Sequence, residues 1–202
     1  MTRDLGEIAK AWLQDRPYGG FNLMMVDPPW KFENYGEPGK KSPEAHYTCE
    51  DIEWVRGLPV GDLAGPNCLL LLWATGPMVP QQLTCLNAWG FQYCTMAWWS
   101  KKTVHGKQSF GQGHVLRNAG EPILVGKRGR VKTTRSTRNT WEGLARGHSR
   151  KPEEAYAAAH ALMPEGREGE GFMTPIRADV FARQRRPGWT AFGNEIDKFA
   201  AA

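Results

Sequence analysis

The stretch Phe21 to Trp30, FNLMMVDPPW, constrains the fold most, because a short apolar run ends abruptly at two prolines. The run Phe21 to Val26 has the length and bulk of a β-strand buried on both faces, as in the centre of a parallel sheet. Proline cannot donate to a sheet ladder and holds φ near about −65°, so the chain must leave the sheet stiffly at Pro28 and Pro29. Ligands of open α/β sheets bind where such strands end. The sequence therefore predicts an α/β fold with a ligand site directly after this strand.

The four residues that follow the strand suit the methylation of an amino group on an aromatic ring. Such a nitrogen is a poor nucleophile, because its lone pair is delocalised into the ring. The Asp27 carboxylate can accept one N–H and the main-chain carbonyl of Pro28 the other, which localises the lone pair. Trp30 offers a flat face on which a base outside its helix can stack. The alternative interpretation is an ordinary strand exit beside a buried tryptophan.

This tetrapeptide resembles the catalytic motif of amino-methyltransferases that use S-adenosylmethionine, and its tryptophan is similar to that of the MT-A family of adenine N(6)-methyltransferases. That family includes the eukaryotic messenger-RNA adenine methyltransferase and small bacterial and phage DNA enzymes. The resemblance runs from about Leu23 to Ile196. It implies a single domain over residues 1–202 with an α/β, Rossmann-like class I methyltransferase fold. It also implies a permuted motif order, in which the catalytic residues come before most of the cofactor-binding segment. The implied catalytic residues are Asp27, Pro28, Pro29 and Trp30.

Other family motifs imply the residues that bind S-adenosylmethionine. The pair His46-Tyr47 matches a position over the cofactor, and Ser149 to Pro152 matches a Ser-x-Lys-Pro segment whose lysine holds the methionine carboxylate. A lysine next to a helix start is a sound anion site, although a plain helix cap would look the same. Arg183 and the pair Asn194-Glu195 match positions that contact the ribose and the carboxylate. The implied cofactor-binding set is Asp27, Tyr47, Lys151, Arg183, Asn194 and Glu195.

The resemblance also implies residues that contact the substrate. The family has a Trp-x-Lys at a strand exit, matched here by Trp99 and Lys101, and a Gly-His-x-x-Arg-Asn-x-x-Glu run, matched from Gly113 to Glu121. A solvated lysine is an equally good interpretation of Lys101, and Glu121 is expected to be a structural partner at a strand start. The implied substrate-binding residues in these motifs are Trp30, His46, Lys101, Arg117 and Asn118.

The formal net charge of +5 is concentrated in one segment, Lys127 to Arg138, which holds six cations and no acid. Its arginine, lysine, serine and threonine side chains can all meet phosphate oxygens. The segment therefore predicts contact with nucleic acid through Arg130, Lys132 and Arg135, although a solvated loop is the plain alternative. The small compact form favours DNA over RNA as the polymer.

The leading hypothesis is a cytoplasmic enzyme that methylates the amino nitrogen of adenine in DNA. The alternatives are an RNA enzyme, an enzyme for another planar amide or amine such as glutamine in a protein, and a nucleic-acid-binding subunit without catalysis. No run approaches the roughly 18 apolar residues of a membrane span, and the N-terminus lacks a signal-peptide core. The four cysteines lack zinc-ligand spacing, so we expect thiols and no metal. A homodimer or a protein partner stays open.

The remaining sequence predicts a fold of alternating helices and strands. We expect helices over residues 8–14, 77–90 and 153–163, and a short helix that ends near Gly57 and is capped by Thr48 with Asp51. Strands beyond the first are expected at 68–74, 91–100, 122–125, 178–182 and 190–193.

Overall fold

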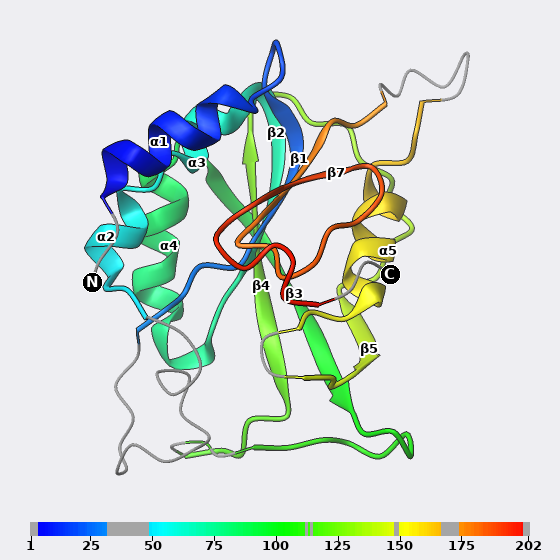
Figure 1. Cartoon of the computed structure of the whole chain (residues 1–202). Helices are drawn as coiled ribbons and strands as arrows, with labels where there is room; N and C mark the ends of the chain where they lie inside the picture. Colours follow the sequence, from blue (N-terminus) through cyan, green and yellow to red (C-terminus); the bar gives the residue numbers. More distant parts are fainter. Residues whose placement is uncertain are drawn as a thin grey trace.

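The computed structural model describes residues 4–31, 49–111, 113, 115–147, 150–166 and 174–199. Within these ranges seven strands form one sheet in the order β5-β3-β4-β2-β1-β6-β7 (Figure 1). Strand β1 (Phe21–Val26) pairs in parallel with β2 (Ala64–Trp73) on one side and with β6 (Arg177–Val180) on the other. The predicted central strand, buried on both faces and flanked by parallel neighbours, is therefore confirmed.

The other elements surround this central group. The remaining strands are β3 (Gln92–Lys102), β4 (Gly120–Arg128), β5 (Thr140–Leu144) and β7 (Trp189–Phe192). The helices are α1 (Leu5–Gln14), α2 (Ile52–Arg56), α3 (Val60–Leu63), α4 (Val79–Ala88) and α5 (Glu153–Leu162), with a 3-10 turn at Gly76–Met78. None of the helices in the described part of the chain is long and apolar enough to cross a membrane.

Strand β4 runs antiparallel to both of its neighbours, β2 and β3. Its first residues therefore lie at the edge where β1, β2 and β6 end, which we call the carboxyl edge. Its last residue, Arg128, pairs with Cys68 near the start of β2 and lies at the opposite edge. The direction of β4 thus decides which of its flanking segments can reach the residues that follow β1.

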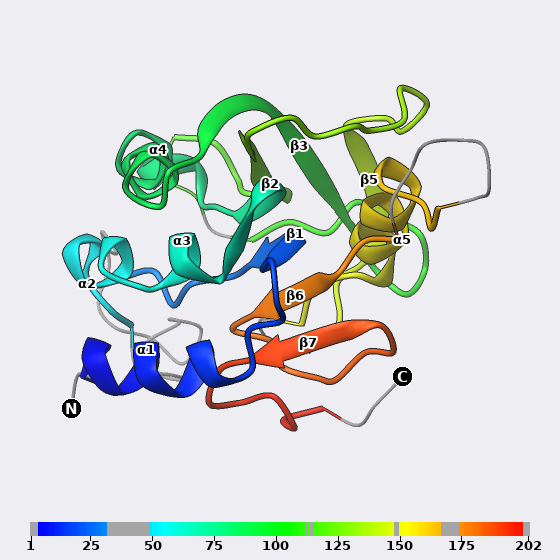
Figure 2. The ribbon, with the colours of Figure 1, turned by 90° about the horizontal axis from the view of Figure 1, so that it is seen from above.

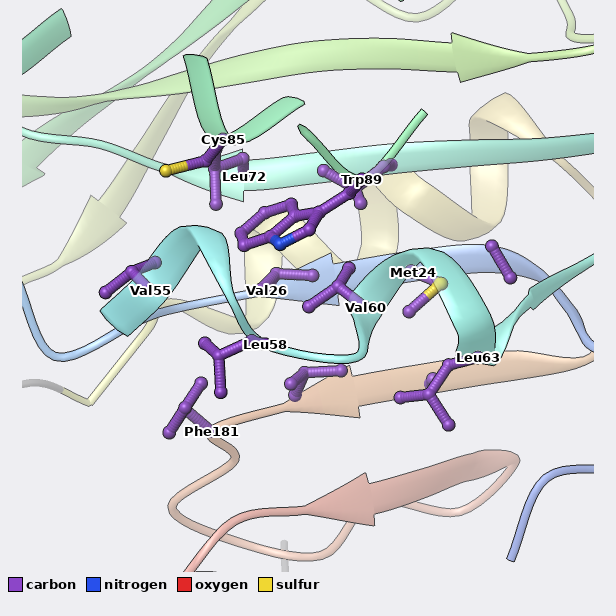
Figure 3. Close-up of a cluster of buried hydrophobic side chains, with 14 of the residues drawn as sticks. Met24, Val26, Val55, Leu58, Val60, Leu63, Leu72, Cys85, Trp89 and Phe181 are labelled. Carbon is purple, nitrogen blue, oxygen red and sulfur yellow. The ribbon is translucent and has the colours of Figure 1, made fainter. Parts of the chain in front are cut away.

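The helices form a layer on each face of the sheet (Figure 2). On one face, helices α1 to α4 cover a cluster that includes Met24, Val26 and Leu72 (Figure 3). On the other face, α5 packs against a cluster that includes Leu23 and Met25. Since side chains alternate along a strand, β1 supplies both clusters and is anchored from both sides. The position of the residues after β1 is therefore rigidly fixed.

The predicted short helix is confirmed as α2, and Asp51 is its N-cap residue, because the Asp51 Oδ1 atom accepts a hydrogen bond of 2.8 Å from the Trp54 N–H. Thr48 lies outside the described residues. Two short elements, α3 and β5, were not predicted. Helix α3 has four residues, and the edge strand β5 has the sequence TWEGL, which lacks a clear apolar pattern. Strand β4 extends beyond the predicted 122–125, so Lys127 and Arg128 belong to the sheet and not to a loop.

Candidate active site

Asp27 follows β1 directly and is held at the carboxyl edge by main-chain hydrogen bonds. Its N–H donates to the Val180 carbonyl at 3.0 Å, which extends the β1–β6 pairing by one step. The Trp30 N–H then donates to the Pro28 carbonyl at 2.9 Å, and the Glu50 N–H donates to the Pro29 carbonyl at 2.8 Å. The side chain of Asp27 is 14% exposed. The two prolines and these bonds present the carboxylate at the surface of the carboxyl edge in one conformation.

Four charged side chains of alternating sign meet at this edge. The Lys151 Nζ atom lies 3.0 Å from Asp27 Oδ1 and 2.9 Å from Glu121 Oε2. The Lys101 Nζ atom lies 2.6 Å from Glu121 Oε1. These four groups come from the end of β1, the start of α5, and the adjacent ends of β4 and β3. We call them the charge chain: Asp27, Lys151, Glu121 and Lys101.

Burial and the neighbouring charges shift the pKa values in the charge chain. Burial raises the pKa of Asp27 above its ordinary value, and Lys151 and Arg183 offset this only in part. Burial alone would also raise the pKa of Glu121, but Lys151 and Lys101 together lower it to about 2. Burial disfavours the charged form of Lys151, yet Asp27 and Glu121 raise its pKa above the ordinary value. At neutral pH, Lys151 and Glu121 are therefore both charged.

Tryptophan rings line the charge chain. Lys151 Nζ lies 4.6 Å from the ring centroid of Trp73, and Lys101 Nζ lies 4.9 Å from that of Trp99, both within cation–π range. The two rings meet edge to face at 6.0 Å. Trp30 is 4% exposed, and its indole N–H donates to the Trp73 carbonyl at 2.9 Å. Trp30 is therefore packed into the wall of the site, and its role as a stacking platform stays a prediction.

A pocket lies beside Asp27 and Lys151, between the start of α5 and the chain that follows β6. In its wall, the Tyr156 hydroxyl donates to Asp179 Oδ2 at 2.8 Å, and the guanidinium of Arg186 lies 3.4 Å from the same oxygen. Burial raises the pKa of Asp179 to about 7, although Tyr156 and Arg186 act against it. The pocket thus contains both carboxyl and cationic groups.

The structure brings several predicted cofactor-binding residues to this pocket. Asp27, Lys151 and Arg183 line it. Glu195 pairs with Arg183, and Asn194 is an exposed residue next to Glu195. Tyr47 lies outside the described residues, as does His46 of the predicted substrate set. No cofactor role is tested by these positions, but the residues predicted from separate motifs do converge.

The predicted substrate-binding residues fall into two groups. Lys101 belongs to the charge chain. Arg117 and Asn118 lie on the exposed connection from β3 to β4, where the Arg117 guanidinium carbon is 5.0 Å from the ring centroid of Phe110. The Asn118 Oδ1 atom accepts a hydrogen bond from the Gly120 N–H at 3.2 Å. This connection starts and ends at the carboxyl edge, so both residues remain substrate-binding predictions.

The basic segment does not lie at the site. Arg130 comes two residues after the end of β4, and its main-chain N–H donates to Asn67 Oδ1 at the opposite edge of the sheet. The segment with Lys132 and Arg135 then reaches the C-terminal end of α5, where Thr134 Oγ1 donates to the Ala161 carbonyl at 2.6 Å. These cations are therefore not placed near Asp27. Their predicted contact with nucleic acid would have to occur on a different part of the surface.

Several residues of the site were not predicted. Glu121 was expected to be a structural partner at a strand start, and its partners, which were not predicted, are both lysines of the charge chain. Asp179 has a signal in the sequence, since it is a carboxylate within a predicted buried strand. The wall residues Tyr156 and Gln184 have no such signal. In the described ranges, no three or more His, Cys, Asp or Glu side chains are arranged to hold a metal ion.

Known proteins with similar sequences include the type II methyltransferase M.MunI of Mycoplasma sp, which is 26% identical over 89% of this chain and 79% of its own length. The human N(6)-adenine-specific methyltransferase METTL4 is 26% identical, and the human N(6)-adenosine-methyltransferase catalytic subunit METTL3 is 27% identical, each over 89% of this chain. The chain spans only 38% and 29% of those two longer proteins.

A family model described as MT-A70 matches residues 21–195. The match begins at the first residue of β1 and ends at Glu195, so it includes the charge chain and every residue that lines the pocket except Phe199. The resemblance inferred from the short motifs is thereby confirmed, together with the class I methyltransferase fold. The chain belongs to the MT-A70 family.

Proposed function

We propose that this protein transfers a methyl group from S-adenosylmethionine to the amino nitrogen of adenine in nucleic acid, and that the nucleic acid is DNA. The observation that carries the proposal is the Asp27 carboxylate, fixed at the end of β1 and paired with Lys151 at 3.0 Å. The relatives' names support it, since they are adenine or type II methyltransferases. We also propose that residues 1–202 act as one domain in the cytoplasm. A homodimer or a protein partner stays a prediction.

Asp27 and Pro28 supply the acceptors that the reaction needs. Lys151 contacts Oδ1 of Asp27, so Oδ2 is the oxygen that can accept one N–H of the substrate amine. The Pro28 carbonyl accepts the Trp30 N–H with one lone pair and keeps a second for the other N–H. Together these acceptors localise the nitrogen lone pair. Since burial raises the pKa of Asp27, the carboxylate can also take up the proton that the methylated nitrogen releases.

The side chains of the pocket fit S-adenosylmethionine in their chemistry. This cofactor carries a carboxylate, an ammonium group and a sulfonium, and the pocket is lined by both cations and carboxyl groups. Lys151, Arg183 and Glu195 are the residues proposed to hold it. When bound, S-adenosylmethionine supplies a strongly electrophilic methyl group, so the protein has to align the amine and exclude water. Those tasks require rigid hydrogen-bond acceptors. Asp27 and Pro28 follow β1, and Asp27 is held in place by its main-chain hydrogen bond to Val180 of β6.

The test follows labelled methyl groups from S-adenosylmethionine into duplex DNA, single-stranded DNA and RNA of matched sequence, and then identifies the labelled nucleoside. We expect N(6)-methyladenine in DNA. Label only in RNA would reassign the polymer and keep the chemistry. Cofactor binding by calorimetry completes the test, because the absence of both binding and transfer would leave a non-catalytic subunit as the better hypothesis.

The position of the basic segment predicts that its contribution to binding affinity depends on the length of the nucleic acid. The part of β4 from Glu121 to Arg128 spans roughly 25 Å at the usual rise of a strand. Duplex DNA rises about 3.4 Å per base pair, so it must extend about seven base pairs beyond the target to reach that edge. Replacing Arg130, Lys132 and Arg135 with glutamine should weaken binding of a long duplex and lower its salt slope by up to about three.

The comparison uses two duplexes, one that ends within about four base pairs of the target adenine and one that continues well past it. Only the longer duplex should lose affinity in the triple variant. Lys10→Gln, on the exposed side of α1, is the control for a lost surface charge and should leave the slope nearly unchanged. An unchanged slope for the triple variant on the longer duplex would contradict the prediction.

A further inference from the structure

Gln184 lines the pocket, and in the described part of the chain the NH₂ group of its side-chain amide has no hydrogen-bond acceptor. The residue is 1% exposed, and its Oε1 accepts a hydrogen bond from Arg150 Nε at 3.0 Å. Because an arginine side chain can only donate, the amide oxygen must face Arg150, which turns the NH₂ group away from it. The Nε2 atom has no hydrogen-bond partner among the described residues. Buried donors without acceptors are rare in native proteins, so this one calls for a ligand or another explanation.

Arg150 differs from the other cations that line the pocket. Each of those contacts a carboxylate: Lys151 with Asp27, Arg183 with Glu195, and Arg186 with Glu153. In the described part of the chain, the side chain of Arg150 contacts only uncharged groups, the Gln184 amide and the ring of Phe199 at 5.2 Å from its centroid. Among the residues that the structure describes, one positive charge without an acidic partner therefore lies next to an amide donor without an acceptor.

The surrounding chain holds these two groups in place before any ligand binds. The Arg150 N–H donates to the Gly147 carbonyl at 3.1 Å, and Pro152 begins the cap of α5 just beyond it. Phe199, which stacks near the guanidinium, is itself fixed because its N–H donates to the Arg183 carbonyl at 2.9 Å. Donors held in this way lose little entropy when an acceptor arrives.

The charge chain makes Lys151 a poor sole partner for a carboxylate. Its ammonium group already contacts two carboxylates, at 3.0 Å and 2.9 Å, and two of its three N–H donors are directed to them. When Asp27 is ionised, the formal charges of the two lysines and the two acids of the charge chain cancel. A carboxylate that enters the pocket thus gains little attraction from Lys151, and an additional cation is needed.

We propose that Arg150 and Gln184 bind the carboxylate of the methionine moiety of S-adenosylmethionine, a proposal that rests on the cofactor proposed above. This carboxylate is the only anionic group of that cofactor. Its two oxygens suit one guanidinium donor and one amide donor side by side. Arg150 occupies the variable position of the Ser-x-Lys-Pro segment, which explains why the motif alone did not single it out.

The test measures binding of S-adenosylmethionine and of its decarboxylated form, which lacks only the carboxylate, by calorimetry without any substrate. In Gln184→Glu, Arg150 gains a carboxylate partner, so the fold should be retained, but negative charge now stands where the cofactor carboxylate would bind. We expect the affinity for S-adenosylmethionine to fall about 10- to 100-fold, while the affinity for the decarboxylated form is unchanged or higher. Arg150→Gln should show the same selective loss.

A matched control is Gln81→Glu, which makes the same change of charge at an exposed position of α4 on the other face of the sheet and should affect neither ligand. Equal losses for both ligands in Gln184→Glu and Arg150→Gln would overturn the assignment. So would normal cofactor binding with a loss of DNA binding, since that result assigns the pair to a phosphate. Wild-type protein that binds neither ligand would instead contradict the proposed function itself.

Discussion

Replacing Asp27 with asparagine is expected to lower kcat for methyl transfer by about 100- to 1000-fold while the protein stays folded. An aspartate has two acceptor oxygens, one for Lys151 and one for the substrate amine. Asparagine has one, and Lys151 at 3.0 Å would retain it. The amide NH₂ would then face the amino group of the base, donor against donor. Single-turnover rates with labelled S-adenosylmethionine and a fixed DNA duplex measure the effect.

Comparing the effect of Asp27→Asn on kcat with its effect on DNA affinity distinguishes a catalytic role of Asp27 from a structural one. If Asp27 acts on the amine during the reaction, kcat should fall far more than the affinity for the DNA. Asp62→Asn provides the control, because it removes one negative charge at an exposed position of α3, remote from the charge chain. Transfer by Asp27→Asn within about threefold of the wild-type rate would contradict the proposed role of the carboxylate.

The sequence predicted the position of Asp27 because the signals for it are local. A run of apolar residues specified a buried strand, and two prolines specified where that strand must end. Neither signal depends on what the rest of the chain does. The lysine of the Ser-x-Lys-Pro segment was recognised in the same way, through a short motif, and the structure places it 3.0 Å from Asp27.

The charge chain could not be predicted, because it depends on the direction of β4. Glu121 reaches Lys151 only because β4 starts at the carboxyl edge and runs antiparallel to β2. The same apolar residues could form a parallel or an antiparallel strand, so the local sequence of β4 does not predict its direction. The same feature carries Arg130 to the opposite edge, a position that the local charge density of the basic segment could not indicate.

The wall of the pocket was missed for a related reason. Tyr156, Asp179 and Gln184 lie on α5, on β6 and in the turn after β6, and they become neighbours only when α5 packs on the sheet. A buried carboxylate such as Asp179 is visible in the sequence as a polar residue in an apolar strand. The lack of an acceptor for the Gln184 NH₂ group among the described residues, by contrast, can be recognised only in the structure.

Replacing Glu121 with glutamine is expected to reduce the free energy of unfolding by about 3 to 5 kcal/mol, the usual result of removing one partner from a buried ion pair. Glu121 contacts Lys101 at 2.6 Å and Lys151 at 2.9 Å, and its side chain is 21% exposed. Without the charge of Glu121, Lys101 loses the carboxylate that it contacts, and Lys151 keeps only that of Asp27, in a largely buried setting. Urea unfolding at neutral pH measures the difference between the two proteins.

The same difference should depend on pH in a defined direction. The pKa of Glu121 is lowered from 4.5 to about 2 by its two lysines. Its charge therefore stabilises the fold above about pH 4.5, and this stabilisation is lost as the pH falls toward 2. The gap in unfolding free energy between wild type and Glu121→Gln should shrink by about 2 kcal/mol between pH 7 and pH 3.

Glu142→Gln separates this effect from an ordinary surface ion pair. Glu142 contacts Lys102 at 2.9 Å, a distance similar to those of Glu121, but its side chain is 69% exposed. Water screens such a pair, so its loss should cost less than about 1 kcal/mol. If Glu121→Gln behaved like Glu142→Gln, the two lysines would not need Glu121 as a counter-ion. Lys151 would then be free to take the cofactor carboxylate alone, so this stability measurement also bears on the role proposed for Arg150.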